Sequence, residues 1–160
     1  MLKESLVKNI IQHLQHELDN ATLAAEKAHL AAIDDQSVAE TQYDTLAIEA
    51  GYLAQGQSRR IVEFQDALAA YRQLDLSPYS QDAAISLGHL VQLDGDAKQQ
   101  HWFFLGPAAA GYRTSIQGHK FTVITPHSPM GKALKGKYPD DEICVALGKG
   151  ELKDFIAAVC

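Results

Sequence analysis

Two stretches decide the fold: Val7–Ala32, VKNIIQHLQHELDNATLAAEKAHLAA, and Tyr43–Tyr71, YDTLAIEAGYLAQGQSRRIVEFQDALAAY. In each, apolar residues recur at alternating steps of four and three, which is the spacing of a coiled-coil seam. The first seam comprises Val7, Ile11, Leu14, Leu18, Ala21, Ala25, Ala28 and Ala32. The second comprises Tyr43, Leu46, Ala50, Leu53, Gln57, Ile61, Phe64, Leu68 and Tyr71, with a slip between Gln57 and Ile61. Each stretch is therefore predicted to form one long helix.

The two seams match when the chain folds back on itself. Ile11 then faces Phe64, and the other pairs keep a nearly constant sum of residue numbers, as an antiparallel hairpin requires. The midpoint of the paired residue numbers falls at Ser37–Val38, which is the predicted turn of the hairpin. The second arm is therefore predicted to run from about Ser37 to Leu74. Each arm should project roughly 45–50 Å, given the helical rise per residue.

Composition narrows the class of protein. The chain has 160 residues and a formal net charge of −6, which argues against broad nucleic-acid binding because that usually needs a basic face. Cys144 and Cys160 are far apart and lack metal-ligand spacing, which is typical of a reduced cytoplasmic protein with two incidental thiols. Charges and amides interrupt Leu2–Leu18, so no signal peptide is indicated. No apolar run approaches the ~20 residues that cross a membrane.

The second half predicts a small α+β domain, in which a twisted antiparallel sheet packs on one short helix. Strands are expected at residues 89–93, 102–105, 121–125, 142–147 and 152–159, and residues 108–118 form either a loop or a further short strand. Ser128 is the expected N-cap and Pro129 the first residue of the short helix, which ends at Gly136. The predicted domains are thus a hairpin at 1–76, a linker at 77–82 and the sheet domain at 83–160.

The turn between the predicted arms is acidic, since Asp34, Asp35, Glu40 and Asp44 lie close together. One interpretation is local: Ser37 is a natural N-cap, and Glu40 three residues later completes a capping box. The alternative is that Asp34, Asp35 and Glu40 bind a hard cation such as Mg²⁺. A single tip cannot complete an octahedral shell, so such an ion would be shared with another molecule.

Two further features belong to the second arm. Arg59 and Arg60 form a small basic cluster on an otherwise acidic rod, which is either a solvated face or a contact for phosphate or an acidic partner. Gly51 lies inside the arm, where glycine costs around 0.5–1 kcal/mol relative to alanine. Close packing of the helix backbones at Ala25 and Ala50 would explain it.

The stretch SPMGKALKGK at Ser128–Lys137, followed by DDEI at Asp140–Ile143, resembles the C-terminal signature of the Gre family of bacterial transcription elongation (transcript-cleavage) factors. The resemblance covers nearly the whole chain, and the family's domain order, hairpin first and sheet domain second, agrees with the hairpin predicted above. The other matching stretches are Leu105–Pro107, Ile124–Pro129, Glu40–Tyr43 and Gly51–Tyr52.

The resemblance implies that the C-terminal domain has an FKBP-like fold and binds RNA polymerase, with Ser128, Pro129, Gly131 and Lys132 as candidate contacts. It implies that the coiled coil enters the secondary channel of the polymerase, so that contact with DNA or RNA occurs only within that complex. Two tip acids would then help the polymerase hold a second Mg²⁺. In such two-metal chemistry one ion activates the attacking water and the other stabilises the leaving oxygen. The chain would be a monomeric accessory factor rather than an enzyme.

The tip departs from the family pattern Gly-Asp-Leu-x-Glu-Asn-Ala-Glu-Tyr. Anchored on Tyr43, the positions of the two family acids are Gln36 and Ala39, neither of which is a carboxylate. Asp35 and Glu40 each lie one residue away and are the candidate catalytic acids. A cleavage-stimulating factor and a secondary-channel regulator without cleavage activity therefore both stay open.

Two other classes also stay open. One is an FKBP-like prolyl isomerase or chaperone, and the other is a structural coiled-coil adaptor with no polymerase partner. An isomerase needs an aromatic-lined pocket, for which the candidates are Trp102, Phe103, Phe104, Phe121 and Tyr138.

Overall fold

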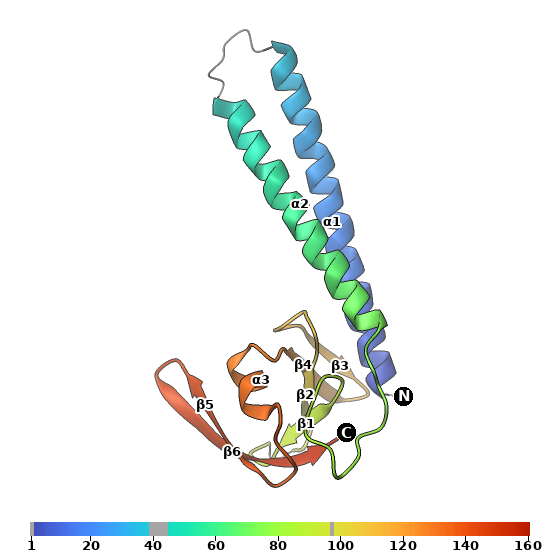
Figure 1. Ribbon diagram of the computed structural model, residues 1–160, viewed down its shortest axis with the longest axis vertical. Coiled ribbons are helices and arrows are strands. Elements are labelled where there is room, and N and C mark those ends of the chain that lie inside the picture. Colours follow the sequence, from blue (N-terminus) through green and yellow to red (C-terminus); the bar gives the residue numbers. More distant parts are fainter. Residues whose placement is uncertain (1, 39–44, 97) are drawn as a thin grey trace. The chain divides into compact units, whose positions relative to one another are not determined.

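The computed structural model describes residues 2–38, 45–96 and 98–160, and for residues 35–38, 45–48 and 50 it describes the backbone alone. The chain order is two long helices, four strands, a short helix and two strands (Figure 1). The elements are α1 (Leu2–Val38), α2 (Thr45–Arg72), β1 (Leu90–Leu93), β2 (His101–Leu105), β3 (Arg113–Ile116), β4 (His119–Ile124), α3 (Pro129–Leu134), β5 (Glu142–Leu147) and β6 (Gly150–Val159). The predicted fold class, a pair of long helices followed by an α+β domain, is confirmed.

The chain divides into two compact units. One unit comprises Gln12–Ala69, and the other joins Met1–Ile11 to Ala70–Cys160.

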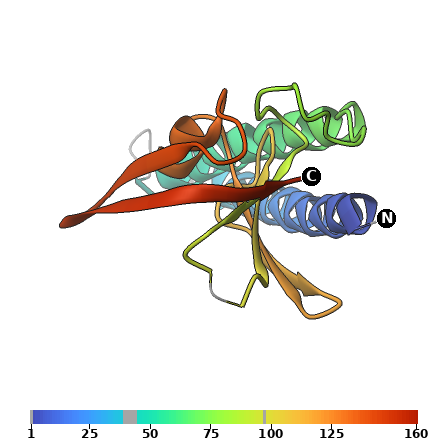
Figure 2. The same cartoon turned by 90° about the horizontal axis from the view of Figure 1, so that it is seen from below.

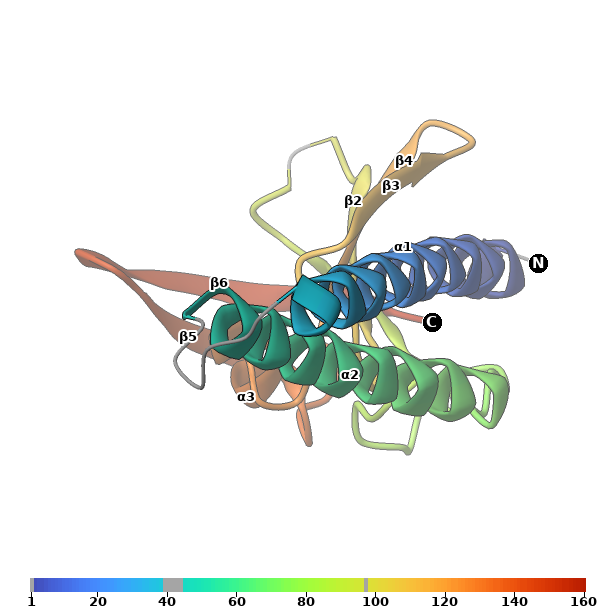
Figure 3. The same ribbon diagram turned by 90° about the horizontal axis from the view of Figure 1, so that it is seen from above.

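In the unit Gln12–Ala69, α1 and α2 lie side by side and run in opposite directions (Figures 1 and 3). Leu14 and Ala21 on α1 are 3% and 5% exposed, and Leu68 on α2 is 3% exposed. Between and beyond them, Leu18 and Ala25 are half-buried. These positions belong to the two predicted seams, while the individual cross-helix pairs stay predictions.

Among the side chains of α2 that the structure describes, Leu53 differs from the predicted inward face. Leu53, a predicted seam residue, is 62% exposed, whereas its neighbour Ala54 is half-buried. Ala54, Gln57, Ile61 and Phe64, all half-buried, follow each other at steps of three, four and three. An uninterrupted helix keeps this rhythm, so no slip is needed and Leu53 falls beside the seam.

Close backbone packing does not account for the glycines of α2. A Cβ added at Gly51 or at Gly56 would meet no neighbouring atom within 4 Å. The explanation predicted for Gly51, a tight contact between the two helices, is therefore wrong.

The first helix also extends further than the sequence indicated. α1 continues to Val38 and α2 begins at Thr45, so the prediction that the second arm starts at about Ser37 is wrong. No glycine or proline occurs in Ile33–Val38, and nothing local breaks the helix there. Ser37 lies inside α1, which removes the predicted capping box because an N-cap needs a non-helical backbone. Residues 39–44 lie outside the described residues.

The other unit contains a six-stranded sheet with the strand order β3-β4-β2-β1-β6-β5. Neighbouring strands of the described sheet are antiparallel as predicted, except that β2 and β4 run parallel, from the pair His101–Lys120 to the pair Leu105–Ile124. The stretch 108–118 supplies the short strand β3, which pairs with β4 along its whole length. The β3–β4 and β5–β6 hairpins lie at opposite edges of the sheet (Figure 2).

The core of this unit lies between the sheet and α3. Leu134 of α3 and Ile156 of β6 are both 0% exposed, and α3 packs against β5. The remaining members of this core cluster are Ile85, Val91, Leu93, Leu105, Ile124, Ile143 and Val145. In the N-terminal segment of the same unit, Leu6 and Ile10 are also 0% exposed.

Candidate partner-binding site

The chain turns into α3 around the side chain of Ser128. Its Oγ donates a hydrogen bond to the Thr125 carbonyl oxygen at 2.7 Å and accepts one from the Gly131 N–H at 3.1 Å. Pro129 takes the first helical position, where a missing N–H leaves no hydrogen bond unmade. The predicted N-cap and helix start are confirmed.

Position 131 requires a glycine because the backbone of α3 comes very close to the backbone of Thr125 there. A Cβ at this position would collide with the Thr125 carbonyl oxygen and lie 3.0 Å from Ser128 Oγ. Ser128 and Gly131 therefore hold the first turn of α3 against residue 125, which is a structural role. Of the four contact residues predicted around α3, Pro129 and Lys132 are exposed, and they are the ones available to a partner.

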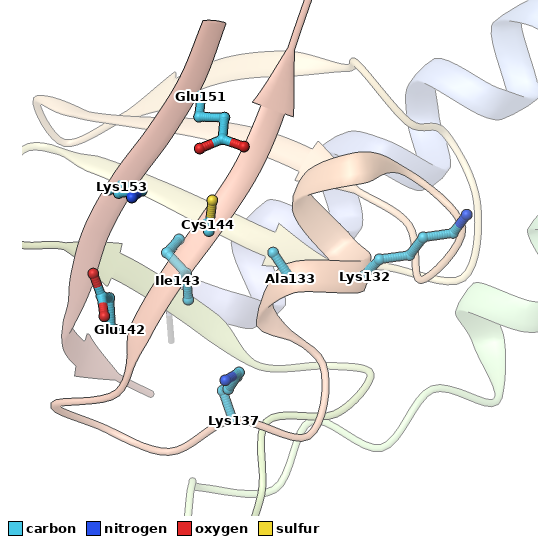
Figure 4. A pocket seen from close by; sticks show the side chains of 8 residues that line it. All are labelled: Lys132, Ala133, Lys137, Glu142, Ile143, Cys144, Glu151 and Lys153. Carbon is cyan, nitrogen blue, oxygen red and sulfur yellow. The ribbon is translucent and has the colours of Figure 1, made fainter.

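A pocket of about 470 Å³ lies beside α3, against β5 and β6 (Figure 4). Its lining residues are Lys132, Ala133, Lys137, Glu142, Ile143, Cys144, Glu151 and Lys153. Ile143 is 2% exposed, and Ala133 packs against the core cluster that contains it, so these two side chains form an apolar floor. The Lys132 side chain points away from that floor (Figure 4).

The rim of this pocket carries charges of both signs. Three lysines and two glutamates line it, and Lys153 stands directly opposite Cys144 in the β5–β6 ladder. Within the part of the chain that the structure describes, none of these five charged side chains forms an ion pair. Protein–protein interfaces commonly have an apolar centre that is surrounded by polar and charged groups. The floor and rim of this pocket have the same arrangement.

A second contact holds the loop that follows β2. Tyr71, the last residue of the predicted second seam, is 2% exposed, and its hydroxyl donates to the Ala108 carbonyl oxygen at 2.7 Å. A Cβ on Gly106 would collide with the same hydroxyl oxygen. Burial raises the pKa of Tyr71, which keeps the phenol protonated as a donor. This role was not predicted, although Gly106 lies in Leu105–Pro107, one of the stretches that resemble the Gre family.

The two predicted basic residues of α2 have different surroundings. Arg59 Nε lies 3.3 Å from Glu63 Oε1, and both side chains are largely exposed. The guanidinium carbon of Arg60 lies 5.8 Å from the centre of the Phe64 ring, within the range of a cation–π contact. Arg60 also lines an open groove on α2 with Tyr52 and Leu53, which are 70% and 62% exposed.

Of the predicted tip acids, Asp34 lies among the described residues. Asp34 is exposed near the end of α1. The side chain of Asp35 and the whole of Glu40 are outside the described residues. In the remainder of the chain, no three His, Cys, Asp or Glu side chains gather closely enough to hold a metal ion. The shared Mg²⁺ site with Asp34, Asp35 and Glu40 stays a prediction.

The aromatic residues considered for a prolyl-isomerase pocket are divided between core and surface. Phe104 and Phe121 are 0% and 2% exposed, whereas Tyr138 is 45% exposed. Trp102 and Phe121 line a cavity of about 290 Å³. Its other lining residues are Leu2, Lys3, Glu4, Leu76, Pro78, Leu90, His119 and Cys160.

Both cysteines, Cys144 and Cys160, are free and exposed.

Across the described residues, none of the helices combines the length and the apolar character needed to traverse a lipid bilayer.

Comparison with known proteins identifies similar solved structures. The crystal structure of GreA factor homolog 1 (Gfh1) protein of Thermus thermophilus is 22% identical, with 94% of each chain covered and a TM-score of 0.38. The crystal structure of Thermus aquaticus Gfh1 is 19% identical, with 92% of each chain covered and a TM-score of 0.37. No protein-family model and no curated protein matches the chain.

Proposed function

We propose that this chain is a Gre-like transcription factor that binds RNA polymerase through the pocket beside α3. One observation carries the proposal. The stretches that resemble the Gre signature, Ser128–Lys137 and Asp140–Ile143, supply most of the lining of that pocket: Lys132, Ala133, Lys137, Glu142 and Ile143. The unpaired charges around its apolar floor are suited to a partner protein.

The long helices give the proposal its second part. A hairpin of one 37-residue and one 28-residue helix, with Asp34 near the end of the first, is suited to entering a channel. In this proposal the hairpin enters the secondary channel of the polymerase and acts on backtracked or paused complexes. Asp35 and Glu40 would share a Mg²⁺ with the polymerase in the two-metal cleavage chemistry.

A regulator that occupies the channel without stimulating cleavage is the closest competing function. Gln36 and Ala39 stand where the family has its two acids, and neither side chain offers a carboxylate to Mg²⁺. A prolyl isomerase is the second competitor, because Trp102 and Phe121 do line a cavity.

Binding is tested first, with immobilised core RNA polymerase and the full chain. Reversing two charges of the pocket, Lys132→Glu with Lys137→Glu, should weaken binding at least tenfold. The control is Lys149→Glu, an exposed lysine in the β5–β6 turn that does not line the pocket, compared with each of the two reversals made singly. If the unmodified chain does not bind the polymerase, the proposal fails, and a proline-peptide isomerisation assay becomes the next experiment.

Cleavage is tested separately, on stalled polymerase complexes with Mg²⁺. Shortened transcripts that disappear with Asp35→Ala or Glu40→Ala would assign cleavage stimulation to these acids. Binding without any shortening would assign the regulator instead.

A further inference from the structure

A second pocket, of about 490 Å³, lies at the edge of the sheet formed by β3 and β4. It is lined by His101, Arg113, Thr114, Lys120, Phe121 and Thr122. Nothing in the function proposed above uses it.

The strand register explains why these side chains meet. Lys120 and Thr122 are two residues apart on β4 and thus point to the same face of the sheet. His101 of β2 is paired with Lys120, and Arg113 of β3 is paired with Thr122. Paired residues share a face, so four polar side chains from three strands converge there.

The pocket is cationic and its charges are unpaired. None of its lining residues is acidic, although the whole chain has a net charge of −6. Arg113 and Lys120 are exposed, and neither takes part in an ion pair among the residues that the structure describes. The carboxylate of Asp96 is nearby, but its contacts are with the backbone: it accepts hydrogen bonds from the N–H groups of Gln100 and His101, both at 2.7 Å.

The same cations act on the imidazole of His101. Burial lowers the pKa of His101, Asp96 opposes that shift, and the positive charges of Arg113 and Lys120 lower the pKa further. His101 Nε2 and Thr122 Oγ1 are hydrogen-bonded at 2.8 Å, which fixes the ring against β4. His101 is therefore held in place by Thr122 and lies within electrostatic range of Arg113 and Lys120.

We propose that this pocket binds a phosphoryl group, carried either by a nucleic-acid strand or by a free nucleotide or phosphate ion. The Arg113 guanidinium offers a planar fork of donors that suits phosphate oxygens, and the Lys120 ammonium adds a compact second charge. The Thr122 hydroxyl group, which lies on the same face of the sheet, is a further hydrogen-bonding group there. The proposal does not depend on polymerase binding.

The test is an NMR titration of the ¹⁵N-labelled full chain with three probes: inorganic phosphate, adenosine monophosphate and a short oligothymidylate. Chemical-shift changes should be confined to amides near His101, Arg113–Ile116 and His119–Thr122. Arg113→Gln and Lys120→Gln should each weaken binding roughly tenfold, the effect of losing one hydrogen bond to a charged group. Lys149→Gln, at the opposite edge of the sheet, should leave binding unchanged.

The three probes identify the source of the phosphoryl group. Tighter binding of the oligothymidylate, with an affinity that falls steeply as salt is added, would assign a nucleic-acid strand. Equal binding of all three would assign a free phosphate or nucleotide. The proposal is overturned if no probe shifts these amides at millimolar concentration, or if the shifts persist in both variants.

Discussion

Replacing Gly106 with alanine should destabilise the unit that contains the sheet, because the added methyl group would collide with the Tyr71 hydroxyl oxygen. Gly106 is buried and does not have a positive φ, so the backbone itself accepts alanine there. The collision with Tyr71 is thus the principal cost, and it can be isolated by removing the hydroxyl group.

The magnitudes follow from the contacts. Gly106→Ala inserts a methyl group into packed surroundings, which typically costs about 1–3 kcal/mol of unfolding free energy. Tyr71→Phe removes the hydrogen bond to the Ala108 carbonyl, at a cost of about 1–3 kcal/mol. In the Tyr71→Phe background the nearest atoms to the new Cβ are the ring carbon Cζ of residue 71 and Val123 Cγ1, both at 3.2 Å. A shift of a few tenths of an ångström relieves such contacts.

The double variant should therefore be less destabilised than the sum of the two single variants, by at least about 1 kcal/mol. Urea unfolding measures this, followed by the fluorescence of Trp102, the one tryptophan of the chain, which lies in β2. Gly150→Ala is the matched control, since a Cβ on Gly150 meets no atom within 4 Å. Additivity within about 0.5 kcal/mol, or a Gly106→Ala variant as stable as the control, would refute the reasoning.

Three further predictions concern stability. Gly51→Ala and Gly56→Ala should each stabilise α2 by about 0.5–1 kcal/mol, because neither position is crowded or needs a positive φ. Thermal unfolding measures this, and a lower Tm would contradict it. Gly131→Ala should cost about 1–3 kcal/mol in urea unfolding because its Cβ would strike the Thr125 carbonyl, and an unchanged midpoint would show that α3 can move away. The third prediction concerns pH: burial raises the pKa of Tyr71, so the folded state holds its proton where the unfolded state releases it. This contribution to stability is complete below about pH 10 and is lost as the pH rises further, by up to about 1.4 kcal/mol per pH unit. The unfolding free energy of the wild type should fall more steeply above pH 10 than that of Tyr71→Phe, and parallel curves would exclude this explanation.

The sheet domain was largely predictable because its signals are local. The strand β5, Glu142–Leu147, was predicted at its observed bounds from the apolar residues between turn-forming ones. The N-cap Ser128 and the following Pro129 specify a helix start by their own chemistry, so α3 was also found. The parallel pairing of β2 with β4 was not predicted, since it depends on β4 lying between β3 and β2, which the local sequence does not specify.

The candidate sites were less predictable. The residues that resemble a family signature did mark the pocket beside α3, but the sequence could not separate Gly131, which packs against Thr125, from Lys132, which is exposed. The cationic pocket was missed entirely. Its residues come from three strands and share no sequence motif, so only the pairing of those strands brings them together.

By itself, the sequence determined the two long helices and the succession of strands, because the periods of apolar residues and the turn-forming residues act over a few neighbours. Tertiary structure alone decided that Ala54 rather than Leu53 faces inward, that Tyr71 needs a glycine at 106, and that Arg113 and Lys120 share a pocket. Each of these depends on the distance between atoms far apart in the chain, and local propensity carries no information about such distances.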